Sequence, residues 1–230
     1  MTITLTRTGL TAATPAWRWW IALHAGFAAV AVAVLLLPAP AAGWRILALV
    51  AAYHAVVVVA ARRLGDAHLW RAWTILAPLS VLMVLPDWFL SEVLGVLHFP
   101  DNGGPFIGTV PLAMAGMWTI ALLPIAGVAL AVQQRSGTRG AAAAAGAAGL
   151  LVFLAAEAAA PLLGLWQPVG VATVGGVAVY VVGPEVALSI CAGLLVCLAP
   201  AIPRPATAAL TALLPFTYLG LLASSYQFLG

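Results

Sequence analysis

The chain contains seven stretches of about 20 mostly apolar residues, which is the length a helix needs to cross a bilayer core of ~30 Å. Hydrophobic residues make up 64% of its 230 positions and charged residues only 7%. A soluble domain carries roughly a quarter charged residues, so a soluble fold is excluded. The sequence therefore predicts an all-α polytopic membrane protein with spans at about 17–37, 46–61, 69–97, 109–132, 141–163, 171–199 and 206–227.

Domain organisation follows from the connections between these stretches, which are short. No charged or Pro/Gly/Ser-rich linker of any length interrupts the apolar segments, so we expect one seven-helix transmembrane domain at 17–230. A polar tail, 1–16, precedes it. Cys191 and Cys197 fall within one predicted span and form no disulfide or metal-binding pattern.

The positive charges are distributed unevenly between the two ends of the predicted spans. When alternate connections are pooled, one side has only Arg45. The amino-terminal side has eight arginines: Arg7, Arg18, Arg62, Arg63, Arg71, Arg135, Arg139 and Arg204. The positive-inside rule then predicts a cytoplasmic amino end and an external carboxyl end, in a bacterial-type cytoplasmic membrane. The net charge of +3 reflects this topology and gives no indication of nucleic-acid binding.

Two acidic residues, Glu157 and Glu185, lie inside predicted spans of a chain that has no lysine. A carboxylate in hydrocarbon costs at least ~2.5 kcal/mol and is usually kept where it faces a cavity or a partner. Tyr180 and Ser189 flank Glu185 at near-helical spacing and could hydrogen-bond it. A structural hydrogen bond for Glu185, or a Glu157 side chain reaching the outer interface, is the alternative interpretation.

Two six-residue segments resemble each other, Pro86–Ser91 and Pro184–Ser189. Each places an acid directly after a proline, with Leu and Ser at matching offsets. Because the third and sixth spans cross the membrane in opposite directions, this pattern predicts an inverted three-helix repeat with a site at the repeat interface. It favours Asp87 as a site residue. Asp87 and Glu92 are five residues apart, so on a regular helix they do not share one face.

The other polar residues give weaker signals. Asp101 lies in a turn-rich outer loop, where a solvated turn is the stronger interpretation, and His98 is close enough in sequence to contact Asp101 or Glu92. His24 and His54 lie within spans and are expected to be neutral and hydrogen-bonded. No HxxH, HExxH or CxxC pattern predicts a metal site, and no GxSxG elbow or phosphate-binding loop is present.

Two blocks of sequence resemble known families of membrane enzymes. The first is Glu92-x-x-Gly95-Val96, followed by Phe99-Pro100, Gly104, Gly108-Thr109-Val110-Pro111-Leu112 and Trp118, and it resembles the central motif of bacterial and archaeal carotenoid hydratases. The second is Glu157, Trp166 and Pro184-Glu185, and it resembles the heterodimeric and fungal-type lycopene cyclases, a set that extends to small seven-span terpene cyclases. A single Glu185 followed by Val186 stands where those cyclases have an acid pair.

This resemblance implies a proton-initiated cyclase or hydratase of a lipophilic isoprenoid that enters from the bilayer, working without a cofactor. It also implies roles for particular residues. Glu185, Glu157, Asp87 and Glu92 would be catalytic acids or bases, since a buried carboxyl group can stay protonated and act as a general acid. Trp88, Trp118, Tyr180, Asp101 and His98 would contact substrate, and aromatic faces would stabilise a carbocation.

Two other classes of function remain open from the sequence. Kinked spans with buried acids also occur in proton-coupled carriers of small lipophilic solutes. A non-catalytic membrane subunit of an isoprenoid enzyme is the third possibility. The sequence does not predict the oligomeric state.

Overall fold

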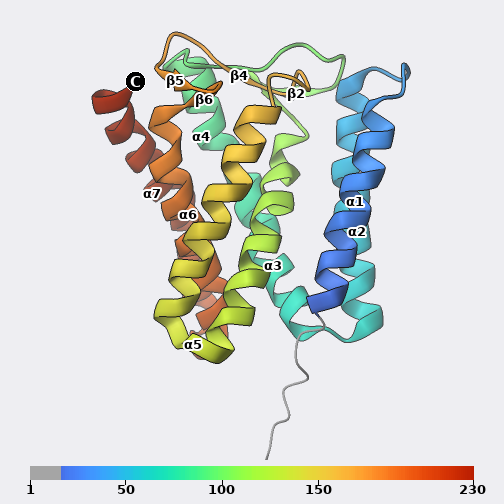
Figure 1. Cartoon of the computed structure of the whole chain (residues 1–230), viewed down its shortest axis with the longest axis vertical. Helices are drawn as coiled ribbons and strands as arrows, with labels where there is room; N and C mark the ends of the chain where they lie inside the picture. Colours follow the sequence, from blue (N-terminus) through green and yellow to red (C-terminus); the bar gives the residue numbers. More distant parts are fainter. Residues whose placement is uncertain (1–16) are drawn as a thin grey trace, which may run out of the picture.

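The structure of the protein, a computed structural model, describes residues 17–230 and is built mainly from long helices (Figure 1). The predicted polar tail, 1–16, lies outside the described residues. The helices are α1 (Trp17–Leu35), α2 (Ala42–Leu64), α3 (Ala67–Leu82), α4 (Val84–Trp88), the π-helix η1 (Phe89–Val93), α5 (Met114–Ala159), α6 (Val179–Leu198), the 3₁₀ turn η2 (Ala199–Ala201) and α7 (Arg204–Leu229). The predicted all-α, membrane-type architecture is confirmed at this level.

Five helical segments within the described residues are long and apolar enough to cross a membrane. They are Ala42–Leu64, Ala67–Val93, Met114–Ala159, Val179–Ala201 and Arg204–Leu229, and a shorter apolar helix covers Trp19–Leu35. The second of these combines α3, α4 and η1 into one rod. Pro86 and Pro184 both lie inside helical segments, as the sequence indicated.

Helix α5 is interrupted near its middle by Gly137. This residue has φ 65° and ψ −166°, a backbone conformation that glycine adopts without the steric penalty of a Cβ atom. The chain turns back at this point, and Figure 1 shows the two halves of α5 running side by side in opposite directions. The rings of Trp118 and Phe153 confirm the turn, because their centroids lie 5.5 Å apart, whereas a straight helix would separate them by roughly 50 Å.

Short strands connect the helices at the end of the molecule opposite the α5 turn. They form three antiparallel pairs: β1 (Leu97–His98) with β4 (Gln167–Pro168), β2 (Phe106–Ile107) with β3 (Val110–Pro111), and β5 (Thr173–Val174) with β6 (Val177–Ala178). The last two pairs are hairpins with two-residue turns. Such turns need positive φ, which Gly108 supplies in one hairpin and Gly175 and Gly176 in the other.

These strands reveal an internal repeat of helix, strand, hairpin and helix. The first copy runs from α4 to the first half of α5, and the second runs from the second half of α5 to α6. The β1–β4 register is symmetric, with Leu97 opposite Pro168 and His98 opposite Gln167. Asp87 precedes the start of β1 by the same number of residues as Glu157 precedes the start of β4. The two copies run in the same direction through the molecule.

This repeat differs from the one predicted from the two proline segments. An inverted repeat would place Pro86 and Pro184 at matching positions in their spans. Pro86 instead lies near the end of the Ala67–Val93 rod, whereas Pro184 lies in the second turn of α6. The prediction of an inverted three-helix repeat is therefore wrong. The similarity of the two proline segments has a local structural cause. In each, the serine hydroxyl donates to the backbone carbonyl oxygen of the acid: Ser91 Oγ to Asp87 at 2.9 Å and Ser189 Oγ to Glu185 at 2.7 Å.

Close packing in the helical core depends on small residues between α5 and α6. A Cβ atom built on Gly149 would overlap the side chain of Ser189, and one built on Gly193 would lie 3.0 Å from the Cβ of Ala145. Helices approach this closely only where one or both carry small side chains. The Ala-rich second half of α5 is thus the part of the chain that lets α6 lie against it.

Candidate functional site

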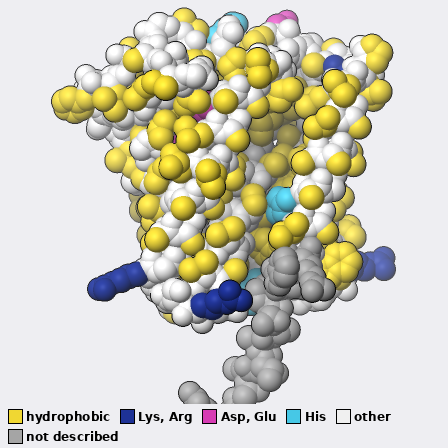
Figure 2. Space-filling view, in the orientation of Figure 1, with side chains coloured by type: hydrophobic (Ala, Val, Ile, Leu, Met, Phe, Trp, Pro, Cys, Tyr) yellow, Lys and Arg dark blue, Asp and Glu magenta, His cyan; other side chains and the backbone are white. Residues whose placement is uncertain are grey.

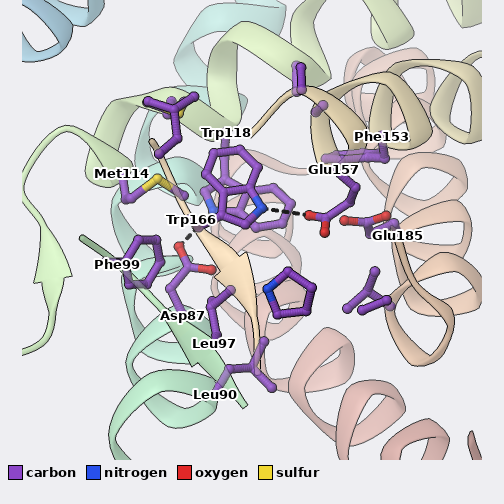
Figure 3. Close-up of a pocket in the computed structure, with 18 of the residues that line it drawn as sticks. Asp87, Leu90, Leu97, Phe99, Met114, Trp118, Phe153, Glu157, Trp166 and Glu185 are labelled. Atoms are coloured by element: carbon purple, nitrogen blue, oxygen red, sulfur yellow. Dashed lines mark hydrogen bonds between the residues drawn. The ribbon is translucent and has the colours of Figure 1, made fainter. Parts of the chain in front are cut away.

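A cavity of about 320 Å³ lies between α4, both halves of α5, α6 and α7, at the end of the bundle nearest the strands. All its lining residues fall between Asp87 and Tyr218. They are mostly apolar and aromatic, and three of them are acids. Figure 3 shows the three carboxyl groups, of Asp87, Glu157 and Glu185, directed into the same space from different helices.

Asp87 is held by a tryptophan from the first half of α5. Asp87 is 3% exposed, and Trp118 Nε1 donates a hydrogen bond to its Oδ2 at 3.0 Å. Pro86 has no backbone N–H to donate, so one helical hydrogen bond is missing in this turn of the Ala67–Val93 rod. The rod then continues as the π-helix η1. Irregular helix of this kind re-aims side chains and is frequent at functional sites.

Glu157, the matching acid in the second copy of the repeat, is also held by an indole, but from a different position in the copy. Trp166 Nε1 donates to Glu157 Oε1 at 2.9 Å, and the carboxyl-bearing residue is 9% exposed. Trp166 belongs to the connection between α5 and β4, so the strand pairing that fixes this connection also positions the indole.

Glu185 differs from the other two acids. It lies in the second turn of α6 and is 4% exposed. Within the described residues, no donor makes a hydrogen bond to its side chain, although the neighbouring Ser189 hydroxyl bonds to its backbone carbonyl. Glu185 occupies the position in the second copy that Trp118 occupies in the first, since each follows the end of its hairpin by the same number of residues.

The remainder of the lining is apolar, and it holds no arginine or histidine. Six aromatic side chains contribute: Phe99, Trp118, Phe153, Trp166, Tyr180 and Tyr218. Tyr218 of α7 is buried with its ring 5.6 Å from that of Trp118. With no cation among them, these carboxyl groups disfavour a state in which all three are ionised. The arrangement can therefore hold at least one protonated carboxyl group in an apolar chamber next to aromatic faces.

One side of the cavity reaches the surface between the two halves of α5. The deep lining residues are buried, but Ile120 and Ala121 of the first half and Val152 and Ala156 of the second are half-exposed. This mouth is apolar, so its opening suits a lipid-soluble guest.

Four of the predicted site residues lie outside the cavity. Glu92, Trp88, His98 and Asp101 are all exposed, and none lines it. Asp87 and Glu92 thus point to opposite environments, as their separation on the helix indicated. Asp101 Oδ1 accepts from the N–H of Gly103 at 2.9 Å, the arrangement of a solvated turn. The structure does not place these four side chains to contact a guest in the cavity.

Five predicted site residues do meet in the cavity: Asp87, Glu157, Glu185, Trp118 and Tyr180. Sequence reasoning missed Tyr218 and Phe153, which no motif marks, and it gave Trp166 no role as a contact of the site. The spacing of Trp166 from Glu157 was the available signal. The three acids are not clustered tightly enough to form a metal site among the described residues.

The intramembrane histidines have structural hydrogen bonds outside the cavity. Tyr53 Oη and His24 Nε2 lie 2.9 Å apart, and His24 Nδ1 lies 2.6 Å from the Trp20 carbonyl oxygen. Trp73 Nε1 donates to His54 Nδ1 at 3.1 Å, which leaves His54 Nε2 to donate to the Gly116 carbonyl. Both ring nitrogens of each histidine have a hydrogen-bond partner, so the expectation of hydrogen-bonded histidines is confirmed.

The comparison with protein families selects the same part of the molecule. A family model described as "Domain of unknown function (DUF6989)" matches residues 84–229. The chain belongs to this family. The DUF6989 match begins at the start of α4 and includes every residue that lines the cavity, both copies of the repeat and α7, but not α1, α2 or α3. No curated protein and no solved structure matches the chain.

Proposed function

We propose that this protein is a membrane-embedded enzyme that protonates a lipophilic isoprenoid and directs the resulting carbocation to cyclisation or hydration, without a cofactor. The observation that carries the proposal is the meeting of three buried carboxyl groups from three helical segments in one aromatic-lined cavity. Buried acids in a bilayer are costly, so their convergence favours a shared chemical role over three separate structural ones.

The hydrogen bonds favour a division of roles among the acids. An N–H donated to a carboxyl oxygen stabilises the charged carboxylate, and Asp87 and Glu157 each accept one from an indole. Glu185 accepts none from the described residues and faces the cavity, so we assign it as the proton donor. Its proton would add to a carbon of an alkene or to the oxygen of an epoxide, leaving a carboxylate and a carbocation.

The cation would then be stabilised by the aromatic faces and by the nearby carboxylates. Attack by a second alkene of the substrate forms a carbon–carbon bond, and loss of a proton to Glu157 or Asp87 restores a neutral product. Attack by water, followed by the same proton loss, gives the hydration product instead. In both the cyclisation and the hydration, the proton that Glu185 donates is balanced by the proton that the carboxylate of Glu157 or Asp87 accepts.

The cavity volume limits how much of a substrate it encloses. About 320 Å³ is near the lower end of the 300–1,000 Å³ found for small-molecule pockets. At roughly 30 Å³ per water-sized group it holds on the order of ten non-hydrogen atoms. One end of a polyprenyl chain would therefore be enclosed, while the remainder would pass through the mouth between the halves of α5 into lipid.

A carrier is less well supported than an enzyme. Transport would need a path from the cavity to the arginine-rich end of the bundle. Below the cavity the helices are closed by buried apolar side chains, including Leu76, Leu123 and Val196, each 0% exposed. A non-catalytic subunit has no specific observation in its favour, because the three acids already meet within one chain.

We also propose that the chain crosses the bilayer seven times, with its amino end cytoplasmic. The two halves of α5 and the shorter α1 would each be a span, in addition to the other four candidate helices. Figure 2 shows most of the visible arginine surface at the end that carries the α5 turn, which supports this orientation through the positive-inside rule.

The test of the enzymatic proposal uses cells that supply polyprenyl precursors. Glu185→Gln and Glu157→Gln each keep the shape of the side chain but remove the acid, and we expect them to lower product formation by about 10²–10⁴-fold, the usual size of a general acid–base contribution. Glu92→Gln, which alters an exposed carboxyl group outside the cavity, is the matched control. Unchanged product from both cavity variants at equal protein levels would refute the proposal.

A further inference from the structure

A second hollow lies at the arginine-rich end, between α3 and α7. It has a volume of about 720 Å³, and η2 borders it on one side. Small side chains on α7, among them Ala208 and Ala212, line this hollow and leave the space between the two helices unfilled. No acid lines this groove, and it is separate from the acidic cavity.

The groove has a charged end and an apolar length. Arg71 of α3 and Arg204, the first residue of α7, both line it at the end nearest the α5 turn. From Arg71 the lining of α3 continues through Ile75 and Pro78 to Leu82. At 1.5 Å per residue this distance is roughly 16 Å, about half of a ~30 Å bilayer core. The groove therefore spans one leaflet.

The arginines at the groove entrance have no carboxylate to pair with among its lining residues. The acid at this end of the described chain, Asp66, caps α3 through the N–H groups of His68 and Leu69 and accepts from Trp20 Nε1. Trp70 stacks on Trp73 beside the groove, a side-chain type that marks the lipid headgroup level.

We infer that the α3–α7 groove binds one anionic phospholipid of the leaflet on the arginine-rich side. Arg71 and Arg204 bind its phosphate, and one acyl chain lies along the apolar length of the groove. Guanidinium groups bind phosphate with paired donors, and basic pockets between transmembrane helices select anionic headgroups. A zwitterionic lipid has the same phosphate but brings a cation next to the two arginines, which weakens the attraction.

Native mass spectrometry of the purified full chain tests this inference. The protein is mixed with equal amounts of phosphatidylglycerol and phosphatidylcholine of the same acyl chains, and the retained lipid is counted. We expect the wild type to retain phosphatidylglycerol preferentially. Arg71→Gln and Arg204→Gln should each reduce this preference roughly fivefold, and the double variant about 25-fold. Arg139→Gln removes an arginine that does not line the groove and should leave the preference unchanged.

A second variant separates loss of the site from loss of the fold. Ala212→Phe keeps both arginines but fills the apolar part of the groove, and it should also lower phosphatidylglycerol retention. Glycerol phosphate, which has the charge without the acyl chains, should not raise the thermal stability of the wild type, whereas phosphatidylglycerol should. Equal retention of the two lipids, or undiminished phosphatidylglycerol retention in the double variant or in Ala212→Phe, would overturn the inference.

Discussion

Replacing Trp118 by Phe removes the only hydrogen bond that the described structure gives to the Asp87 carboxyl group, yet keeps an aromatic ring beside Phe153 and Tyr218. The bond is buried at both ends, with Asp87 3% and Trp118 8% exposed, so water does not replace it in the variant. We expect Trp118→Phe to destabilise the protein, partly through the lost bond and partly through lost packing. A double-mutant cycle separates the two contributions.

The size of the coupling depends on the charge of Asp87. Neutral hydrogen bonds between transmembrane helices couple by about 0.6 kcal/mol on average, with a maximum near 1.7 kcal/mol. A bond to a charged group contributes about 1.5–3 kcal/mol. If Asp87 is the carboxylate that our division of roles requires, the cycle of Trp118→Phe with Asp87→Ala should give about 1.5 kcal/mol or more. In the cycle with Asp87→Asn, the amide oxygen can still accept the indole N–H. The coupling measured in that cycle should therefore contain only the part that depends on the charge of Asp87.

The assay is reversible unfolding in mixed micelles of lipid and detergent, with helix content followed by circular dichroism. Trp73→Phe with His54→Ala is a matched control, because it removes an indole N–H bond of 3.1 Å to a neutral imidazole in the same bundle. That cycle should give about 0.6 kcal/mol. A Trp118–Asp87 coupling no larger than the control would refute the assignment of Asp87 as a carboxylate, and a coupling near zero would refute the bond itself.

Two further predictions concern the packing and the topology. Gly149→Ala should destabilise the protein by about 1–3 kcal/mol because its Cβ would overlap Ser189, whereas Gly220→Ala, in α7 with nothing within 4 Å, should be neutral or stabilising; thermal unfolding of the two variants compares them directly. For the topology, a cysteine placed at Asp101 should react with a membrane-impermeant maleimide from outside intact cells, while one at Ser136 should react only after permeabilisation. Labelling of both from the same side would contradict the proposed orientation.

The helices and the buried acids were predictable because each requirement of the bilayer leaves a clear pattern in a single amino-acid sequence. A span needs about 20 apolar residues, and an acid inside one is rare. The predicted break between the fourth and fifth spans contains Gly137, where α5 turns. The start of α6 was placed too early, since the apolar residues 171–178 form the β5–β6 hairpin instead. Strands of two residues have no periodicity that a sequence can display.

The side-chain partners were less predictable, for reasons that particular residues make clear. Trp166 follows Glu157 at a distance that no helical rule connects, and only the β1–β4 pairing brings its indole back to the carboxyl group. Glu92 carries the same charge as the cavity acids, and its separation from Asp87 indicates only that the two face different environments, without indicating which of them faces the cavity. Tyr218 reaches the cavity from α7 without any motif around it.

The internal repeat explains why the cavity holds three acids and not two or four. Its two copies contribute equivalent positions: Asp87 matches Glu157, and Trp118 matches Glu185. In the first copy, Trp118 donates its indole N–H to Asp87. In the second copy that donor is replaced by an acid, and Glu157 takes its indole from Trp166 in the connecting segment. A single substitution within a duplicated frame thus replaces an indole donor with a carboxyl group that faces the cavity and has no donor among the described residues. If this reasoning is right, Glu185→Trp should restore the arrangement of the first copy and abolish the proposed activity, while disturbing the fold less than Asp87→Trp, which places an indole where both copies carry an acid.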